Sequence, residues 1–283
     1  MANLFRSLVF VPGNNPRFLE KAKSISADIV CFDLEDSVPE KEKTKARKLI
    51  KSALKQRKHY SANIYARTNS PESGKIESDL KEIMQKGIDG IVIPKVNSAK
   101  ELKKIEKTII SLEKKGKISG TRIIPSIESA LGVVNCYEIA CCSKRIDAVV
   151  FGIFDLLNDI GIEYTKGNPR GAKYARYKIP VDVTAAGVYA IDGIWQDIKD
   201  KSGLKKDCDV GRSLGYVGKS IIHPDQIETV HKIYHPNKNE IRWAKLVVKT
   251  YNSSTKKGKG ATVVDGKMID EVHYKRAKAL LEI

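Results

Sequence analysis

The sequence predicts an α/β protein whose main part is a (β/α)8 barrel, followed by a C-terminal segment of helices and a small hairpin. Eight short apolar runs recur along the chain up to residue 222. Helical patterns separate these runs, and charged or polar residues gather after them, which is typical of a barrel of alternating strands and helices. An open doubly wound sheet is the alternative, but no GxGxxG motif follows the first run.

The first predicted strand spans residues 8–11 and ends in a turn at residues 12–15, where a glycine and two asparagines tolerate unusual backbone angles. Pro16 then begins a helix that carries Arg17 and Lys21. A loop that opens into a helix N-terminus is a natural phosphate site. This region is therefore a candidate for anion binding, on a pattern of low specificity.

The second strand, residues 28–32, is followed by Asp33, Glu35 and Asp36. Three acids within four residues repel one another unless a cation or hydrogen-bond donors compensate. This density of acids favours a functional site. The alternative is a solvated loop with a cap for the amphipathic helix that is predicted over residues 39–54.

The third and fourth strands, residues 63–67 and 90–95, end in Arg67 and Lys95. The guanidinium fork matches two oxygens at once, so Arg67 suits a substrate carboxylate. Lys95 is a residue of the same kind at the end of the next strand. Charged residues thus recur at the same end of successive strands.

The fifth and sixth strands, residues 123–127 and 148–152, are short, apolar and rich in β-branched residues. This composition is typical of strands that are buried on both faces of a parallel sheet. Residues 129–140 have a helical apolar pattern, which predicts the crossover helix between the two strands. Each strand is followed by an acid, Glu128 or Asp155.

Neighbouring parallel strands would bring Glu128 and Asp155 together at one edge. Two carboxylates without a nearby Cys or His suit a hard ion such as Mg²⁺, which keeps several waters and takes one or two carboxylates plus substrate oxygens. The alternative is that both acids stabilise the first turns of helices, where acids are common.

The seventh strand, residues 187–192, is weaker, and the eighth, residues 218–222, ends at His223-Pro224. Beyond the barrel, the sequence predicts a helix over residues 239–248 and a polar, basic break over residues 253–259. A hairpin over residues 261–267 and a last helix that begins near Asp270 follow. We divide the chain into a barrel, residues 1–236, and a C-terminal segment, residues 237–283. Such a segment is often a lid or an oligomerisation arm, and capping alone would also explain Asp270.

Composition indicates a globular protein with a heavily ionised surface: 41% of the 283 residues are hydrophobic and 30% are charged. The five cysteines are odd in number and lack metal-binding spacing, so we expect reduced residues that serve mostly in packing; a reactive Cys141-Cys142 pair is the alternative. No apolar run approaches the roughly 20 residues of a membrane span, and the N-terminus lacks signal-peptide features. We therefore expect a cytoplasmic protein without a membrane partner.

A formal net charge of +17 raises the question of an anionic partner, either nucleic acid or a phosphate-bearing metabolite. The lysines, however, are dispersed over most predicted helices, as a solvated surface requires. The aromatic residues do not alternate with them in the way that a stacking platform for bases would need. We expect no nucleic-acid partner.

An ordered set of motifs resembles the citrate lyase beta-subunit-like proteins of the HpcH/HpaI aldolase superfamily, which include malyl-CoA and citramalyl-CoA lyases. The resemblance covers nearly the whole chain, and the ordered set is far more specific than any one motif. The motifs are Arg6-Ser7 with residues 10–13 (FVPG), residues 33–39 (DLEDSVP), Pro94-Lys95, residues 127–132 (IESALG), Phe151-Gly152 with Asp155-Leu156, residues 190–193 (AIDG), residues 215–219 (GYVGK) with residues 222–224 (IHP), and residues 266–270 (GKMID).

The resemblance implies a TIM barrel with a site whose residues have distinct roles. Glu128 and Asp155 would hold Mg²⁺, and Arg67 would bind the substrate carboxylate. Asp33, Glu35 and Asp36 would bind the water molecules of the metal. The residues implied to contact coenzyme A are Phe10, Lys21, Asn15 and Arg17. Asp270 would be the general acid or base. The resemblance also implies a homo-oligomer, a trimer or hexamer, in which Asp270 reaches the site of a neighbouring subunit.

The implied reaction cleaves a 3-hydroxyacyl-CoA thioester between C2 and C3, or forms it, with an acyl-CoA and a 2-oxo acid as the other partners. Mg²⁺ would polarise the carbonyl of the oxo acid as a Lewis acid, and backbone donors would stabilise the enolate oxygen. The alternatives are a malyl-CoA thioesterase and the beta subunit of a citrate lyase complex, which takes an acyl-carrier-protein thioester. A basic nucleic-acid-associated protein is the non-enzymatic alternative.

The sequence departs from the family pattern at three places. Asn15 stands where the family often has Arg, so the phosphate contact is weaker or moves to Arg17. Glu271-Val272 follows the final Asp in place of the usual pair, and residues 129–131 are Ser-Ala-Leu where Thr-Ala-Arg is usual. These departures bear on the acyl group and the carrier more than on the class of reaction.

Overall fold

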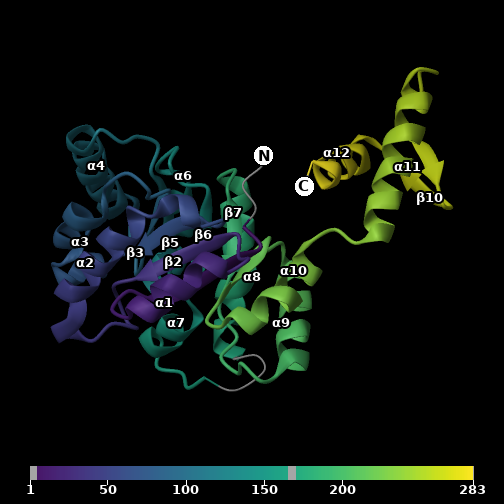
Figure 1. The fold of residues 1–283 in the computed structure, drawn as a ribbon. Helices are drawn as coiled ribbons and strands as arrows, with labels where there is room; N and C mark the ends of the chain where they lie inside the picture. The colour runs from purple at the N-terminus through teal and green to yellow at the C-terminus, as the bar shows by residue number, and fades with distance from the viewer. Residues whose placement is uncertain (1–4, 165–169, 283) are drawn as a thin grey trace. The chain divides into compact units, whose positions relative to one another are not determined.

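The computed structural model describes residues 5–164 and 170–282. Eight parallel strands follow one another in chain order around a closed barrel, and β8 pairs with β1 to close it (Figure 1). The predicted (β/α)8 barrel is confirmed. The strands are β1 (Ser7–Pro12), β2 (Ile29–Asp33), β3 (Asn63–Arg67), β4 (Gly90–Ile93), β5 (Arg122–Ile127), β6 (Ala148–Phe151), β7 (Tyr189–Asp192) and β8 (Gly218–Ile221).

Helices connect the strands, as the alternating pattern predicts. They are α1 (Pro16–Lys21), α2 (Lys43–Leu54), α3 (Ile76–Ile83), α4 (Ala99–Gly116), α5 (Ala130–Val134), α6 (Cys136–Cys141), α7 (Ile153–Asp159), α8 (Lys173–Ala185) and α9 (Lys201–Leu214), with α10 (Ile227–Tyr234) after the last strand. Across the described ranges, no helix has the length and apolar character needed to cross a membrane.

The interior of the barrel is filled by side chains from alternate strand positions. Its buried core includes Leu8, Ile29, Cys31, Tyr65, Val92, Ile124, Ala148, Val150 and Ile191. Successive side chains of a strand point to opposite faces, so the residue two positions after an inward residue also faces inward. Asp33 follows Cys31 in this way, and Arg67 follows Tyr65. The strand pattern thus places charged groups above the apolar core at the C-terminal ends of the strands.

The structure divides into two compact units, the barrel over Phe5–His231 and a unit that begins at Lys232. This division lies a few residues before the boundary proposed from the sequence. The second unit contains α11 (Lys238–Thr255), the hairpin β9 (Thr262–Val264) and β10 (Lys267–Ile269), and α12 (Glu271–Leu281). Its core consists of Ala244, Val247, Val264, Ile269 and Ala277. A lid or oligomerisation role for this unit stays a prediction.

Two helices differ from the prediction. The single helix expected over residues 129–140 is divided at Asn135, whose side-chain amide donates to the carbonyl oxygen of Asn97 at 2.8 Å. The helix expected over residues 239–248 instead continues to Thr255. Its polar end is stabilised because the Thr255 hydroxyl donates to the carbonyl oxygen of Tyr251, whose ring stacks on Tyr274 at 4.8 Å between centroids.

Closure of the barrel depends on a glycine at the start of β8. A Cβ atom at Gly218 would overlap the carbonyl oxygen of Phe5 and the backbone of Arg6. We therefore expect Gly218→Ala to lower the free energy of unfolding by about 1–3 kcal/mol, the usual cost of overpacking, as measured by chemical denaturation. Gly260→Ala is the matched control, since no atom lies within 4 Å of the added methyl group. Equal stability of the two variants would contradict this view of the closure.

Candidate active site

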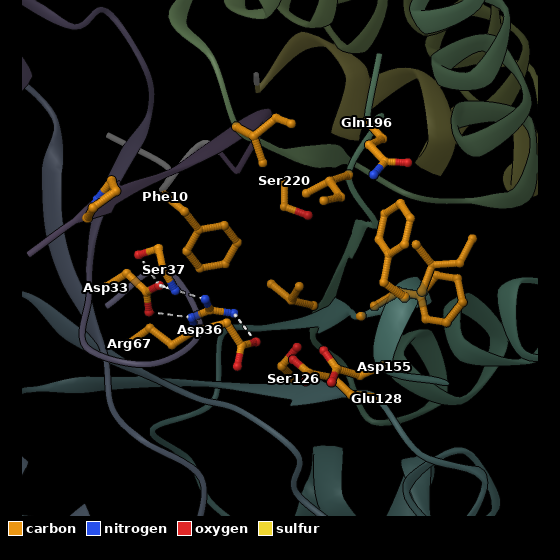
Figure 2. A pocket seen from close by; sticks show the side chains of 18 residues that line it. Phe10, Asp33, Asp36, Ser37, Arg67, Ser126, Glu128, Asp155, Gln196 and Ser220 are labelled. Atoms are coloured by element: carbon orange, nitrogen blue, oxygen red, sulfur yellow. Dashed lines mark hydrogen bonds and ion pairs between the residues drawn. The ribbon is translucent and has the colours of Figure 1, made fainter. Parts of the chain in front are cut away.

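A cavity of about 470 Å³ contains the charged residues at the C-terminal ends of the strands. Figure 2 shows Asp33, Ser37 and Arg67 on one side of it, with Glu128 and Asp155 on the other. The polar and charged residues that line it are Asp33, Asp36, Ser37, Arg67, Ser126, Glu128, Asp155, Gln196 and Ser220, and Phe10 is among the apolar ones. The structure therefore brings together residues from most of the strands or the loops that follow them.

Arg67 is held in place by Asp33. The guanidinium donates from Nε to Oδ1 at 2.6 Å and from Nη2 to Oδ2 at 2.7 Å. Ser37 donates to Asp33 from its hydroxyl and backbone, and Glu35 donates from its backbone. Burial alone would raise the pKa of Asp33, but the charge and hydrogen bonds of Arg67, helped by the other donors, lower it to about 2. Asp33 is therefore ionised and Arg67 is fixed.

The ring of Phe10 packs against the guanidinium group of Arg67. The guanidinium carbon lies 4.5 Å from the centroid of the Phe10 ring, a cation–π geometry. Asp33 occupies the Nε side of the guanidinium, so the Nη1 and Nη2 end is the part available to a ligand, and Glu35 approaches Nη1 at 3.2 Å. This arrangement suits a carboxylate that binds end-on to Arg67.

The cavity has more carboxylates than its cations neutralise. Burial raises the pKa of Glu35 to about 8, although Arg67 and Lys95 lie at ion-pair distances from it. Burial also raises the pKa of Glu128 to about 7, and the charge of Asp155 adds to this shift. Both carboxyl groups would be stabilised as anions by a further cation.

Glu128 and Asp155 fit a hard divalent cation. The Oε2 atom of Glu128 is buried and accepts no hydrogen bond. A Cβ atom at Gly152 would overlap the Glu128 side chain, so the glycine provides the space in which this carboxylate lies. Within the described ranges no group of three or more His, Cys, Asp or Glu is arranged to hold a metal. Two carboxylates would therefore leave most positions of a Mg²⁺ ion to water and substrate.

The alternative interpretation of Glu128 and Asp155, as residues in the first turns of helices, is correct only for Asp155, because Ser129 caps α5 and Glu128 lies before it. Asp155 lies in the first turn of α7 and also lines the cavity, so it can serve both purposes. Asp36 lines the cavity but is exposed, whereas Asp33 and Glu35 are buried.

The residues proposed to contact coenzyme A lie on the first strand and on α1. Asn15 caps α1 by accepting a hydrogen bond from the backbone of Arg17. Arg17 and Lys21 are exposed on this helix. Phe10 instead lines the cavity and packs on Arg67. A role of these residues in carrier binding stays a prediction.

Asp270 lies in the second compact unit, where it caps α12. Its Oδ1 atom accepts from the backbone of Val272 and His273. The Nδ1 atom of His273 lies 2.6 Å from the same oxygen and 3.4 Å from the backbone nitrogen of Asp270. These hydrogen bonds, first of all that of the His273 side chain, lower the pKa of Asp270.

Sequence reasoning missed two sets of residues, one beside Asp270 in the second compact unit and one that lines the cavity of the barrel. The first is His273, whose spacing of three from Asp270 is a capping-box pattern that could have indicated the pair. The second is Ser126, Gln196 and Ser220, which line the cavity. Ser37 and Gly152 also line it and lie within motifs of the family resemblance, although the sequence assigned them no role. Ser126 could have been found because it lies two positions before Glu128 on the inward face of β5.

Comparisons with known proteins agree with this geometry. The family model described as HpcH/HpaI aldolase/citrate lyase matches residues 6–224. The chain belongs to this family.

Curated relatives of the family cover almost the whole chain. One, from Leuconostoc mesenteroides subsp. cremoris, is named citrate lyase subunit beta; it is 36% identical over 99% of this chain and 93% of its own length. Another, from Cereibacter sphaeroides, is named (3S)-malyl-CoA thioesterase; it is 32% identical over 99% of this chain and 94% of its own.

A solved structure of CitE from Mycobacterium tuberculosis in complex with magnesium, acetoacetate and coenzyme A is 26% identical, with a TM-score of 0.81. It covers 99% of this chain and 98% of its own. The family match confirms the resemblance and the enzyme class that it implied, a citrate lyase beta-subunit-like carbon–carbon lyase.

The buried pair of Asp33 and Arg67 predicts how stability depends on pH. The pKa of Asp33 falls from 3.8 in the unfolded chain to about 2 in the fold, so its contribution is complete above pH 4 and is lost as the pH falls through 2. This contribution is roughly 2 kcal/mol. We expect Asp33→Asn to remove it, which chemical denaturation between pH 2 and 5 can measure.

The control is Asp36→Asn, which removes an exposed charge from the same loop. The difference in the free energy of unfolding between Asp33→Asn and the native protein is expected to narrow as the pH falls from 5 to 2. For Asp36→Asn, the free energy of unfolding is expected to depend on pH in the same way as that of the native protein. A constant difference for Asp33→Asn would mean that its carboxylate does not carry this stability.

Proposed function

We propose that this protein is a Mg²⁺-dependent carbon–carbon lyase that acts on a 3-hydroxyacyl-CoA thioester such as malyl-CoA, citramalyl-CoA or citryl-CoA. It would cleave the thioester into an acyl-CoA and a 2-oxo acid, or join these two in reverse. The observation that carries the proposal is one cavity in which the carboxylates of Glu128 and Asp155 lie across from the fixed guanidinium of Arg67. The names of the curated relatives support it, as does the solved CitE complex with magnesium and coenzyme A.

Arg67 would select the substrate by its charge. The carboxylate next to the carbon that bears the hydroxyl binds the Nη1 and Nη2 end of the guanidinium, because Asp33 already occupies the other side. Bidentate binding fixes the orientation of the oxo-acid half of the substrate. Phe10 packs on the guanidinium, so the arginine does not need to reorganise on binding.

Glu128 and Asp155 would hold Mg²⁺, with Asp33, Glu35 and Asp36 near the waters of the metal. When bound, the metal supplies Lewis-acid polarisation of the 2-oxo-acid carbonyl and offsets negative charge on that oxygen. In cleavage, a base takes the proton of the C3 hydroxyl, the electrons of the C2–C3 bond move into the thioester enolate, and C2 then takes up a proton. Asp270 is proposed as the acid or base, from a neighbouring subunit of a trimer or hexamer.

The carrier and the fate of the thioester distinguish the alternatives. Purified protein with Mg²⁺ would be offered malyl-, citramalyl- and citryl-CoA and the corresponding acyl-carrier-protein thioester. Release of glyoxylate, pyruvate or oxaloacetate supports the lyase. Release of free coenzyme A and malate instead indicates the thioesterase, and turnover of the carrier-protein thioester alone indicates the citrate lyase beta subunit. No turnover of any of these compounds would refute the proposal.

The metal ligands are tested by neutral substitutions of nearly the same shape. We expect Glu128→Gln and Asp155→Asn each to lower kcat/KM by about 100-fold or more, the scale on which electrostatic stabilisation of a transition state acts. Each is also expected to weaken Mg²⁺ binding in isothermal titration calorimetry. Glu138→Gln, which removes an exposed carboxylate from α6, is the control and is expected to leave both values unchanged. Full activity in either variant would end the assignment.

Asp270 is expected to transfer a proton as a general acid or base and not to bind the metal. Asp270→Asn keeps the oxygen that accepts the capping hydrogen bonds of α12 but has no titratable carboxyl group. We expect kcat to fall by about 10²- to 10⁴-fold, as for a lost general acid or base, while Mg²⁺ affinity by calorimetry stays native. Loss of metal binding together with activity would contradict this separation of roles.

A further inference from the structure

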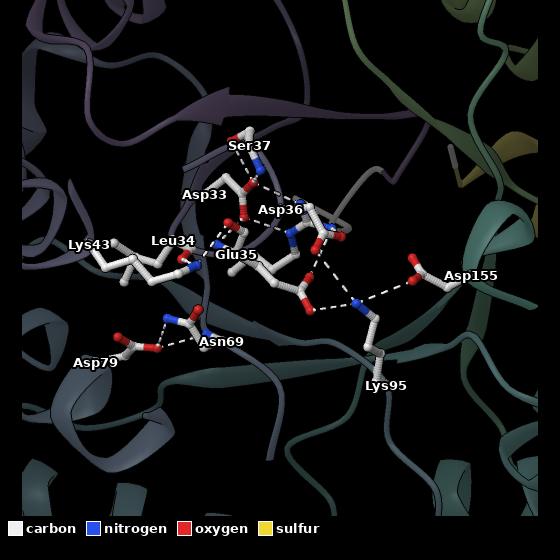
Figure 3. A network of polar contacts seen from close by, with 11 residues as sticks. Asp33, Leu34, Glu35, Asp36, Ser37, Lys43, Asn69, Asp79, Lys95 and Asp155 are labelled. Atoms are coloured by element: carbon white, nitrogen blue, oxygen red, sulfur yellow. Dashed lines mark hydrogen bonds and ion pairs between the residues drawn. The ribbon is translucent and has the colours of Figure 1, made fainter. Parts of the chain in front are cut away.

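Lys95 lies among acids at the edge of the cavity. Figure 3 shows its ammonium group between the loop after β2 and the start of α7. The Nζ atom is 3.1 Å from Oε1 of Glu35, 3.5 Å from Oδ1 of Asp36 and 3.2 Å from Oδ1 of Asp155. One ammonium thus contacts three carboxylates, one of which is a proposed metal ligand.

The backbone of Lys95 is strained to hold it there. Its φ angle is +53°, in the left-handed region that non-glycine residues rarely adopt. Strain of this kind persists only when the surroundings impose it, and it gathers at functional sites. At this position the Lys95 ammonium reaches Glu35, Asp36 and Asp155 together.

The cluster around Lys95 has more acidic than basic side chains. The described cluster contains five carboxylates and two cations: Asp33, Glu35, Asp36, Glu128 and Asp155, with Arg67 and Lys95. Arg67 is bound to Asp33 through two hydrogen bonds and cannot follow changes elsewhere. Lys95 has a flexible stem and a side chain that is 31% exposed.

Lys95 stays charged in this environment. Burial alone would lower the pKa of its ammonium, but the charges of Glu35, Asp36 and Asp155 together raise that pKa. It is therefore a permanent positive charge next to the carboxylate that Mg²⁺ is proposed to use.

We propose that Lys95 is the built-in counter-ion of the metal site: its ammonium group holds Asp155 in the metal-free enzyme, competes with Mg²⁺ for that carboxylate, and withdraws onto Glu35 and Asp36 when the metal binds. This inference rests on the proposed function, since it takes Glu128 and Asp155 as the ligands. Lys95 is a positioning residue in this scheme. It keeps the acids from repelling one another and limits how tightly the metal is held.

The test is the affinity of the metal-free protein for Mg²⁺, measured by isothermal titration calorimetry without substrate. Lys95→Met removes the charge and keeps the length of the side chain. It is expected to bind Mg²⁺ about tenfold more tightly, because both the competitor and the repulsion between the two cations are gone. Lys95→Arg keeps the charge, and its affinity is expected at or below the native value. Lys100→Met, on the exposed start of α4, is the control for a general change in net charge and is expected to match the native protein.

Two outcomes are distinct. If the native protein binds Mg²⁺ and Lys95→Met binds it equally or more weakly, with an unchanged thermal unfolding midpoint, the counter-ion role is refuted and the metal site stands. If the native protein binds no Mg²⁺, both the metal site and this inference fail. A crystal structure with Mg²⁺ gives a second measurement: the Lys95 Nζ atom is expected beyond ion-pair distance of Asp155, and an intact ion pair beside the bound metal would overturn the proposal.

Discussion

The site depends on one electrostatic constraint, the burial of several carboxylates at one end of a barrel. Charges are expensive to bury unless they are paired and hydrogen-bonded. Asp33 meets this requirement in full, with Arg67 and two backbone donors, and its pKa falls. Glu35 and Glu128 do not, and the pKa of each rises. A site that is short of positive charge in this way is suited to bind a divalent cation and an anionic substrate together.

The barrel supplies the geometry that this constraint needs. Parallel strands end at the same rim, so residues that are far apart in sequence share one cavity. The alternation of each strand decides which of its last residues face inward, and Asp33 and Arg67 lie in phase with the apolar core below them. Glycine occupies the positions where a side chain would not fit. The absence of a Cβ atom at Gly152 leaves room for the Glu128 side chain, and its absence at Gly218 lets β8 approach β1.

The two cations of the site, Arg67 and Lys95, differ in how they are held and in the role that each suits. Arg67 is fixed by Asp33 and Phe10, which suits a residue that must present the same face to every substrate molecule. Lys95 makes longer contacts with carboxylates from two separate segments, which suits a residue whose partners change. The difference follows from their chemistry, since the guanidinium is a planar fork and the ammonium is a point charge on a flexible stem.

The sequence by itself determined the eight strands, their order and the acids and bases at their ends, because strand patterns and charged strand ends are local features. It also predicted that Glu128 and Asp155 would reach one cavity, which follows from parallel pairing. Only the tertiary structure decided that Arg67 is bound to Asp33, that Lys95 bridges to Asp155, and that Asn135 divides a helix. These contacts join residues about 30 to 60 positions apart, and the choice of a side-chain partner at that separation depends on packing, which no local pattern encodes.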